Sequence, residues 1–397
     1  MIEKVDFGGW PNCMRLCNNE IELIVTTDIG PRIIRLGFLN KQNIFHVSPQ
    51  DSGKIGGTDW RIYGGHRLWH SPEVMPRSYF PDNNPVDYAI DAQTITLTQS
   101  KEATTGIVKE MEITLMPDNN QVTVLHRLIN HNLWDVELSP WGISALAQGG
   151  RAIIPQEPYG VGDDYLLPAR PLVLWQCVQM QDPRWIWGNK YIQARQDPDR
   201  ASKQKIGVLN KQGWSAYYLN GELLIKRFGY IPGAQYPDFN SNNEIYIDGN
   251  LLEVESLGPM VKLAPQGKVE HTEHWLLTRA NMDESEESID TNLLPIVNSW
   301  QPRRLLHMTN GAWAACDGQI EAASKYILTL PRKEYVSSYG ITKHHGYPFT
   351  KQIAATPVRR TLRILLMKET QVRFPPPPPY LFNKYNNLNL TNTLGKH

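Results

Sequence analysis

The sequence lacks several features that would assign a protein to a class by themselves. Four cysteines among 397 residues are too few for a disulfide scaffold, which favours a reducing, cytoplasmic location. Forty basic and forty acidic residues cancel, so the chain-wide positive field of nucleic-acid-binding proteins is missing. No run of about 18 apolar residues occurs, and the first ten residues lack the apolar core of a signal peptide. We therefore expect neither nucleic acid nor a membrane as a partner.

Motifs of common enzyme chemistry are absent too. The sequence has no Walker A loop, Rossmann glycine fingerprint, G-x-S-x-G elbow or H-E-x-x-H pair. Cys13 and Cys17 are four residues apart, but no second cysteine pair follows, so a zinc site is not predicted. No period of 20–50 residues repeats, which argues against a propeller or solenoid. We expect no cofactor and no metal.

Charge and composition divide the chain into parts. Residues 301–397 carry fourteen basic and four acidic residues, so their net charge is +10 and residues 1–300 carry −10. Five consecutive prolines, Pro375 to Pro379, are expected to form a polyproline II rod. We interpret the chain as a main domain, a C-terminal extension without a clear pattern, and a proline run with a disordered tail, at 1–280, 281–374 and 375–397.

The main domain is rich in predicted strands. Short segments alternate or run apolar between polar turns, and sustained helical periodicity is scarce before residue 280. The turn at 116–120 joins two of these segments into a long antiparallel hairpin. The predicted strands are 21–25, 32–38, 94–98, 110–115, 122–130, 222–227, 244–247, 251–256 and 269–277. This pattern predicts a mainly β protein built as an antiparallel sandwich.

The densest group of functional side chains follows Gly64 and Gly65. It contains His66, Arg67, Trp69, His70 and Glu73. An arginine fork, a flat indole and fixed hydrogen-bonding groups suit a polyhydroxylated ligand, because sugar C–H faces pack on aromatic rings. A surface loop anchored by the tryptophan is the alternative. The spacing of the two histidines would allow a metal on a helix, but the flanking glycines and Pro72 argue against a helix there.

A second group lies in the predicted strand 251–256. Glu253 and Glu255 point to the same face of a strand. Either both are solvated, or one has a raised pKa and acts as a general acid or base. Lys226 ends an apolar strand and is a candidate to reach a pocket, and Trp141 is a candidate to line a cleft; in both cases a structural role is the alternative.

The order of these segments resembles the galactose mutarotase-like superfamily, which includes the aldose 1-epimerases. The stretch 29–36 is similar to that family's early G-A-x-I-x-x-L strand, and 64–73 to the segment beside its sugar site. The stretch 122–141 resembles its central strand, and 253–265 its late strand with the catalytic glutamate. The resemblance implies a β-supersandwich, here with the poorly patterned C-terminal extension, and a concave sugar-binding face.

The resemblance also implies a mechanism of acid–base ring opening. A carboxylate removes the proton of the anomeric hydroxyl, and a histidine protonates the ring oxygen. Glu255 matches the base, with Glu253 as the fallback. Where the family carries a histidine after the central strand, this sequence reads 139–144 without one, so His66 or His70 is the expected acid. The residues predicted to bind substrate are Arg67, Trp69, Glu73, Trp141, Lys226, Asp238 and Glu253.

Two functions therefore stand open. The first is an aldose 1-epimerase-like isomerase acting on a free sugar or sugar phosphate. The second is a non-catalytic carbohydrate-binding protein that retains the fold but lacks the family's histidine pair. A relative of the supersandwich domains of polysaccharide lyases or hydrolases is a third, less favoured interpretation. The fold cannot choose between them, because function resides in the site.

Overall fold

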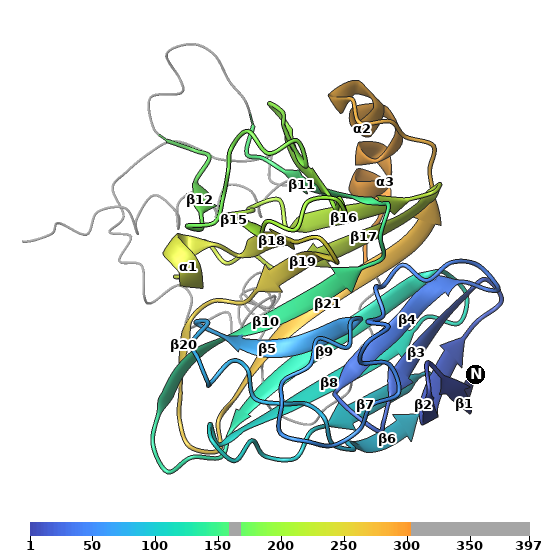
Figure 1. Cartoon of the computed structure of the whole chain (residues 1–397), viewed down its shortest axis with the longest axis vertical. Coiled ribbons are helices and arrows are strands. Elements are labelled where there is room, and N and C mark those ends of the chain that lie inside the picture. Colours follow the sequence, from blue (N-terminus) through green and yellow to red (C-terminus); the bar gives the residue numbers. More distant parts are fainter. Residues whose placement is uncertain (159–167, 303–397) are drawn as a thin grey trace, which may run out of the picture. The chain divides into compact units, whose positions relative to one another are not determined.

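The structure is a computed structural model that describes residues 1–158 and 168–302 (Figure 1). Two antiparallel sheets dominate it. The first contains, in spatial order, β1 (Ile2–Phe7), β2 (Trp10–Cys17), β3 (Ile21–Thr26), β4 (Arg32–Phe38), β5 (His66–Ser71), β10 (Val136–Leu146), β19 (Leu252–Leu257), β18 (Asn243–Ile247), β15 (Gln204–Val208) and β12 (Leu172–Leu174), with β20 (Val261–Leu263) also paired to β10.

The second sheet is formed from the remaining strands. Its spatial order is β13 (Trp185–Trp187), β14 (Tyr191–Arg195), β11 (Arg151–Pro155), β16 (Trp214–Leu219), β17 (Glu222–Phe228), β21 (Lys268–Arg279), β9 (Gln121–Asn130), β8 (Ile107–Leu115), β7 (Thr94–Thr98) and β6 (Asp87–Asp91). A short α1 (Pro237–Asn240) precedes β18. Among the described residues, no helix is long and apolar enough to cross a membrane.

The two sheets face each other across one apolar core. In it Trp275 of β21 packs against Phe45, which forms a bridge with Leu146 of β10; their ring centroids are 5.7 Å apart. The predicted hairpin is present as β8 and β9, which pair from Leu115 opposite Val122 onward. Buried and half-buried residues alternate strictly along β9, as expected for a strand with one face in the core. The mainly β, antiparallel supersandwich prediction is confirmed.

Two helices pack on the other face of the second sheet. They are α2 (Glu286–Asn292), capped by the Ser285 side chain, and α3 (Leu294–Ser299). Ile289, Val297 and Trp300 form a buried cluster with Trp214 and other residues of that sheet. The extension predicted at 281–374 therefore begins with packed residues. Its part from 303 onward and the predicted tail at 375–397 lie outside the described residues, and the boundary at 280 remains a prediction.

The segment after Gly64 and Gly65 is a strand rather than a surface loop. All six residues of β5 are buried. Both glycines have positive φ angles, 98° and 70°, and a Cβ on them would lie 2.1 and 2.3 Å from the backbone oxygens of His46 and Ile33. The glycine pair therefore lets the chain turn tightly into the middle of the first sheet. β5 carries polar residues on both faces, so it lacks the alternation by which strands are recognised.

Candidate functional site

Polar side chains of five neighbouring strands gather on the outer face of the first sheet, the face that does not meet the second sheet. The register places Arg67 opposite Ile143, Ile143 opposite Glu255, and Glu255 opposite Glu244. Because side chains alternate along a strand, residues two positions away share this face. We call this group the outer cluster; its members are Arg67, Trp69, Trp141, Lys205, Glu244, Glu253 and Glu255.

Lys205 is the central cation of the outer cluster. Its Nζ lies 2.9 Å from Glu244 Oε2 and 3.2 Å from Glu255 Oε2, with Glu73 Oε2 at 3.9 Å. The ammonium also lies 4.6 Å from the centroid of the Trp141 ring. Burial alone would lower the pKa of Lys205, but the surrounding carboxylates outweigh burial and raise it. Lys205 is therefore a fixed positive charge.

Three carboxyl groups of this region have raised pKa values. Burial raises the pKa of Glu244 well above its ordinary value, and the negative charges of Glu255 and Asp238 add to the effect. Burial likewise raises the pKa of Glu253, although Arg67 opposes it, and the pKa of Asp238. Both carboxyl oxygens of Glu244 are buried without a well-aligned hydrogen bond. The protonated form of Glu244 is thus favoured at a higher pH than for an exposed glutamate.

Aromatic rings form a wall beside these charges. Trp69 and Trp141 are 5.4 Å apart between centroids, and Trp60 and Tyr79 pack edge to face against Trp69 at 5.9 and 5.1 Å. The Arg67 guanidinium lies 4.8 Å from the Trp69 ring and forms a 3.0 Å ion pair with Glu253. Tyr79 donates a hydrogen bond to Glu73, which connects the loop after β5 to the same wall.

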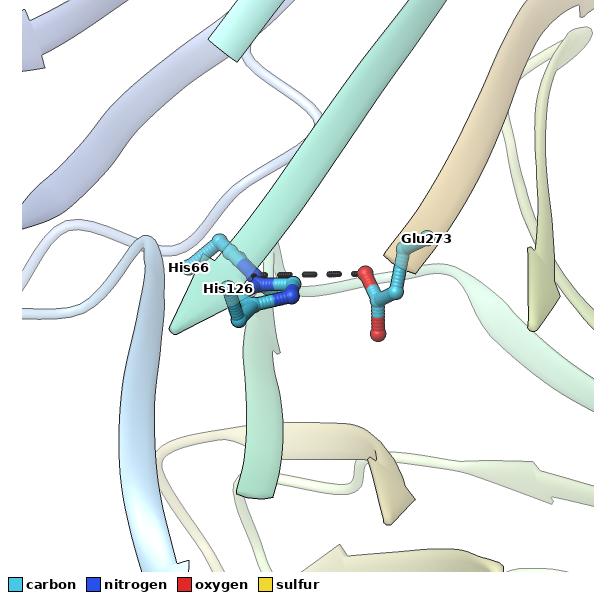
Figure 2. Close-up of side chains that lie close together, drawn as sticks. All are labelled: His66, His126 and Glu273. Carbon is cyan, nitrogen blue, oxygen red and sulfur yellow. Dashed lines mark hydrogen bonds and ion pairs between the residues drawn. The ribbon is translucent and has the colours of Figure 1, made fainter. Parts of the chain in front are cut away.

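A second polar group lies between the two sheets, and Figure 2 shows three of its side chains, His66, His126 and Glu273. We call it the inner cluster; its members are His66, His126, Ser144, Lys226, Ser256, His271 and Glu273, all nearly or fully buried. Because successive side chains of a strand point to opposite faces, His66 of β5 points inward while Arg67 points outward. The inner cluster therefore lies directly beneath the outer cluster, on the opposite side of the first sheet.

The donor and the acceptor can be assigned for each hydrogen bond that links Lys226, Ser144, His66 and His126. Lys226 Nζ donates to Ser144 Oγ at 2.8 Å, and His126 Nδ1 donates to the His271 carbonyl at 2.9 Å. The His126 Nε2 is then an acceptor for His66 Nε2, 2.7 Å away, and His66 Nδ1 accepts from Ser144 at 2.8 Å. The neutral imidazoles of His66 and His126 are thereby each assigned one tautomer, with the proton on Nε2 of His66 and on Nδ1 of His126.

Glu273 and Lys226 form the ion pair of the inner cluster, at 3.1 Å. Glu273 also accepts from Ser256 Oγ at 2.5 Å and Trp275 Nε1 at 2.7 Å. Burial would raise the pKa of Glu273, but Lys226 and the imidazoles lower it overall. Burial lowers the pKa of His66 well below its ordinary value and lowers that of His271 to about 3. The cluster is one ion pair surrounded by neutral imidazoles.

His66, His126 and Glu273 could also be considered as metal ligands, because their ligand atoms lie within 4.8 Å of one another. Two imidazole nitrogens on one tetrahedral zinc, each about 2.0–2.1 Å from the metal, are more than 3 Å apart. The Nε2 atoms of His66 and His126 are only 2.7 Å apart, the separation of a hydrogen bond. Lys226 already provides the positive charge beside Glu273. As arranged here, these residues fit a hydrogen-bonded network better than a metal site.

The predicted site residues therefore divide between the two faces. Glu253, Glu255, Arg67, Trp69 and Trp141 belong to the outer cluster, and Glu73 and Asp238 lie beside its Lys205. Lys226 and His66 belong to the inner cluster. His70 also points inward, where its Nε2 lies 3.2 Å from Glu102, which pairs with Lys109 at 2.6 Å. The expected pairing of Glu255 with His66 or His70 across one sugar is not met, because the sheet separates them.

Sequence reasoning missed several members of the outer face. Glu244 and Lys205 are the single charged residues of β18 and β15, and that contrast was the available signal. Trp60 and Tyr79 lie in loops whose path the sequence does not reveal. His46 is a further candidate: Phe45 points into the core and bridges Leu146, so alternation places His46 toward the outer face. Burial lowers the pKa of His46.

No family model matches the chain, and no curated protein matches it. A TPR-domain-containing protein from Parabacteroides distasonis aligns with a TM-score of 0.50 and 14% identity, over 75% of this chain and 50% of that one. The chain thus spans half the length of that protein, and at this identity the alignment shows the fold alone.

Two further solved structures are described as galactose mutarotase-like proteins. A galactose mutarotase-like protein from Lactobacillus casei aligns with a TM-score of 0.45 and 10% identity, over 67% of this chain and all (100%) of that one. A galactose mutarotase-like protein from Clostridium acetobutylicum aligns with a TM-score of 0.43 and 11% identity, over 70% of this chain and 98% of that one. The chain is structurally similar, at low sequence identity, to bacterial galactose mutarotase-like proteins.

Proposed function

We propose that this chain is a carbohydrate-active protein that binds a neutral sugar at the outer cluster and interconverts its anomers, as an aldose 1-epimerase-like isomerase. In this proposal Glu255 is the general base and Glu244 the general acid. The observation that carries it is the direct cross-strand pairing of these two glutamates, with Lys205 between their carboxyl groups and an aromatic wall beside them. Ring opening needs an acid and a base within reach of one pyranose.

Glu255 is arranged as the base by two donors on one oxygen. Trp141 Nε1 donates to Glu255 Oε2 at 2.8 Å, and Lys205 Nζ donates to the same atom at 3.2 Å. These two bonds fix the orientation of the carboxyl group. Within the described residues, Oε1 receives no hydrogen bond from the protein, which leaves it to accept the proton of the anomeric hydroxyl.

Glu244 is arranged as the acid because its surroundings favour the protonated carboxyl group. As Glu255 takes the proton from the C1 hydroxyl, the C1–O5 bond breaks and a carbonyl forms at C1. The electron pair moves to O5, which takes the proton of Glu244. Rotation about the C1–C2 bond and the reverse transfers close the ring as the other anomer and restore both glutamates. No net oxidation or added reactant is needed.

The charge of the site favours a neutral sugar over a sugar phosphate. Five carboxyl groups, those of Glu73, Asp238, Glu244, Glu253 and Glu255, surround two cations. Both cations, Lys205 and Arg67, already pair with glutamates. A phosphate placed there would meet repulsion without an unpaired cation to bind it.

The test is anomer exchange measured by NMR across a panel of aldoses and aldose phosphates. We expect the wild type to accelerate exchange of a neutral aldose, and Glu255→Gln and Glu244→Gln each to lower the rate at least a hundredfold. The matched control is Glu137→Gln, an exposed glutamate of the same strand as Trp141, which should leave the rate unchanged. His46→Gln separates the acids: a full loss in this variant, with activity kept in Glu244→Gln, would reassign the acid to His46.

A binding protein without catalysis is the second candidate, and one observation favours it. The outer cluster is closed by its own contacts: Glu244 is 0% and Glu255 1% exposed, so a sugar on the aromatic wall has little access to the proposed acid and base. Saturation transfer from protein to sugar without faster exchange would support binding alone and refute the isomerase. Absence of both signals for every sugar would refute the sugar site itself.

A further inference from the structure

A cavity of about 580 Å³ lies on the outer face of the second sheet, beside the chain that leads into α2. Arg151, Arg195, Tyr218, Asn281 and Glu284 are among its lining residues, and we call it the arginine cavity. The outer cluster lies on the far side of the first sheet. The arginine cavity is therefore separated from the proposed sugar site by both sheets and the core between them.

Two arginines on neighbouring strands line this cavity side by side. Arg151 of β11 is directly opposite Arg195 of β14, and on its other side it is directly opposite Tyr218 of β16. Like charges directly opposite each other in a sheet repel and are destabilising. Among the described lining residues Glu284 is the one carboxylate, so the lining itself carries two positive charges and one negative; Asp283, just outside the lining, also acts on Arg151 electrostatically.

The hydrogen bonds of these arginines are incomplete within the described residues. Arg151 Nη2 donates to the Asp283 carbonyl at 2.5 Å, but its Nε is buried without a partner. The Arg151 guanidinium lies 5.9 Å from the Tyr218 ring centroid. Arg195 is exposed, and its side chain forms no ion pair with a described residue. The exposed Arg195 guanidinium therefore remains available to a ligand in the cavity.

The walls of the cavity leave space for more than an inorganic ion. Gly149 and Gly221 line it with positive φ angles of 90° and 85°, and an added Cβ on either would approach no atom closer than 3.9 Å. A volume of this size is within the range of small-molecule sites. The Tyr218 ring offers an apolar surface beside the charges.

We propose that the arginine cavity binds a small phosphorylated metabolite, with its phosphate between Arg151 and Arg195. Guanidinium groups match phosphate oxygens with paired donors, and such charge-assisted bonds are shorter and stronger than neutral ones. The phosphate would relieve the repulsion between the two arginines, and the rest of the ligand would lie along Tyr218 toward the two glycines. The inference does not depend on catalysis at the outer cluster.

Isothermal titration calorimetry of the full chain tests this site, with glucose 6-phosphate, inorganic phosphate, glucose and succinate as probes. We expect both phosphates to bind, glucose 6-phosphate more tightly, and the affinity to fall with rising salt. Arg195→Gln should weaken phosphate binding at least tenfold, because it removes a charge-assisted hydrogen bond to the phosphate. Since Arg195 is exposed, this variant should fold normally, whereas Arg151→Gln also removes a bond to the backbone.

The matched control is Arg200→Gln, which removes an exposed arginine paired with Asp197 elsewhere on the surface. It should leave phosphate binding unchanged. Equal phosphate affinity in Arg195→Gln and the wild type would overturn the proposal. So would the absence of phosphate binding at millimolar concentration, or preferential binding of succinate, which would assign the cavity to carboxylates instead.

Discussion

Replacing Lys226 with methionine tests the ion pair at the centre of the inner cluster. The change removes the ammonium 3.1 Å from Glu273 Oε1 and keeps a similar side-chain volume. Glu273 is 0% exposed and would retain only the Ser256 and Trp275 donors. A buried carboxylate without its counter-charge costs about 3–5 kcal/mol. We therefore expect Lys226→Met to lower the free energy of unfolding by about that amount at pH 7.

The double variant makes this test decisive. Adding Glu273→Gln removes the unpaired charge, so Lys226→Met/Glu273→Gln should be more stable than either single variant. The assay is urea unfolding followed by circular dichroism, with all four proteins compared at pH 7. A loss below about 1 kcal/mol in Lys226→Met, or a double variant less stable than both single variants, would refute the ion pair as described. Binding at the outer cluster should survive in the double variant, because Lys226 lies beneath the sheet.

Three further predictions concern stability. Gly142→Ala should cost about 1–3 kcal/mol in urea unfolding, because its Cβ would lie 3.0 Å from Glu273 Oε1 and 3.4 Å from His66 Cε1; an unchanged midpoint would contradict the packing. The pKa of His271 falls from 6.5 to about 3 on folding, so the stability that its neutral imidazole contributes is fully present above pH 6.5 and is lost as the pH falls toward 3. Between pH 7 and pH 5 the free energy of unfolding should fall by about 2 kcal/mol. A constant free energy of unfolding over this window would be inconsistent with a neutral imidazole. Trp300→Ala should cost about 3–5 kcal/mol, because Trp300 is buried where α3 packs on the second sheet; an unchanged midpoint of urea unfolding would contradict that packing.

Strands whose residues alternate or run apolar were predictable from the sequence. The segments 32–38 and 94–98 match β4 and β7, because alternation or an apolar run between polar turns is a local signal. The shared face of Glu253 and Glu255 was predictable for the same reason. β5 was not, because it is buried on both faces and carries polar side chains on each.

The division of the site into two clusters depends on contacts between distant strands. His66 and Arg67 are neighbours in sequence, yet one meets His126 and the other meets Glu253. Neither partner could be identified without the sheet order, which brings β5 beside β10 and places β9 beneath them. Chemical composition alone grouped His66, Arg67 and His70 into one site, whereas the period of two separates them.

The strand order has a further consequence for solubility. Among residues 1–158 and 168–302 neither sheet closes on itself, so β1, β12, β13 and β6 stand at the ends of the two strand orders with one side unpaired by any described strand. Such edges can recruit a strand from another molecule and begin aggregation. Here β12 and β13 are only three residues long, and β6 begins and ends with Asp87 and Asp91. β1 carries Glu3, Lys4 and Asp6. Short length and charge therefore protect each open edge from pairing with a second copy of the chain.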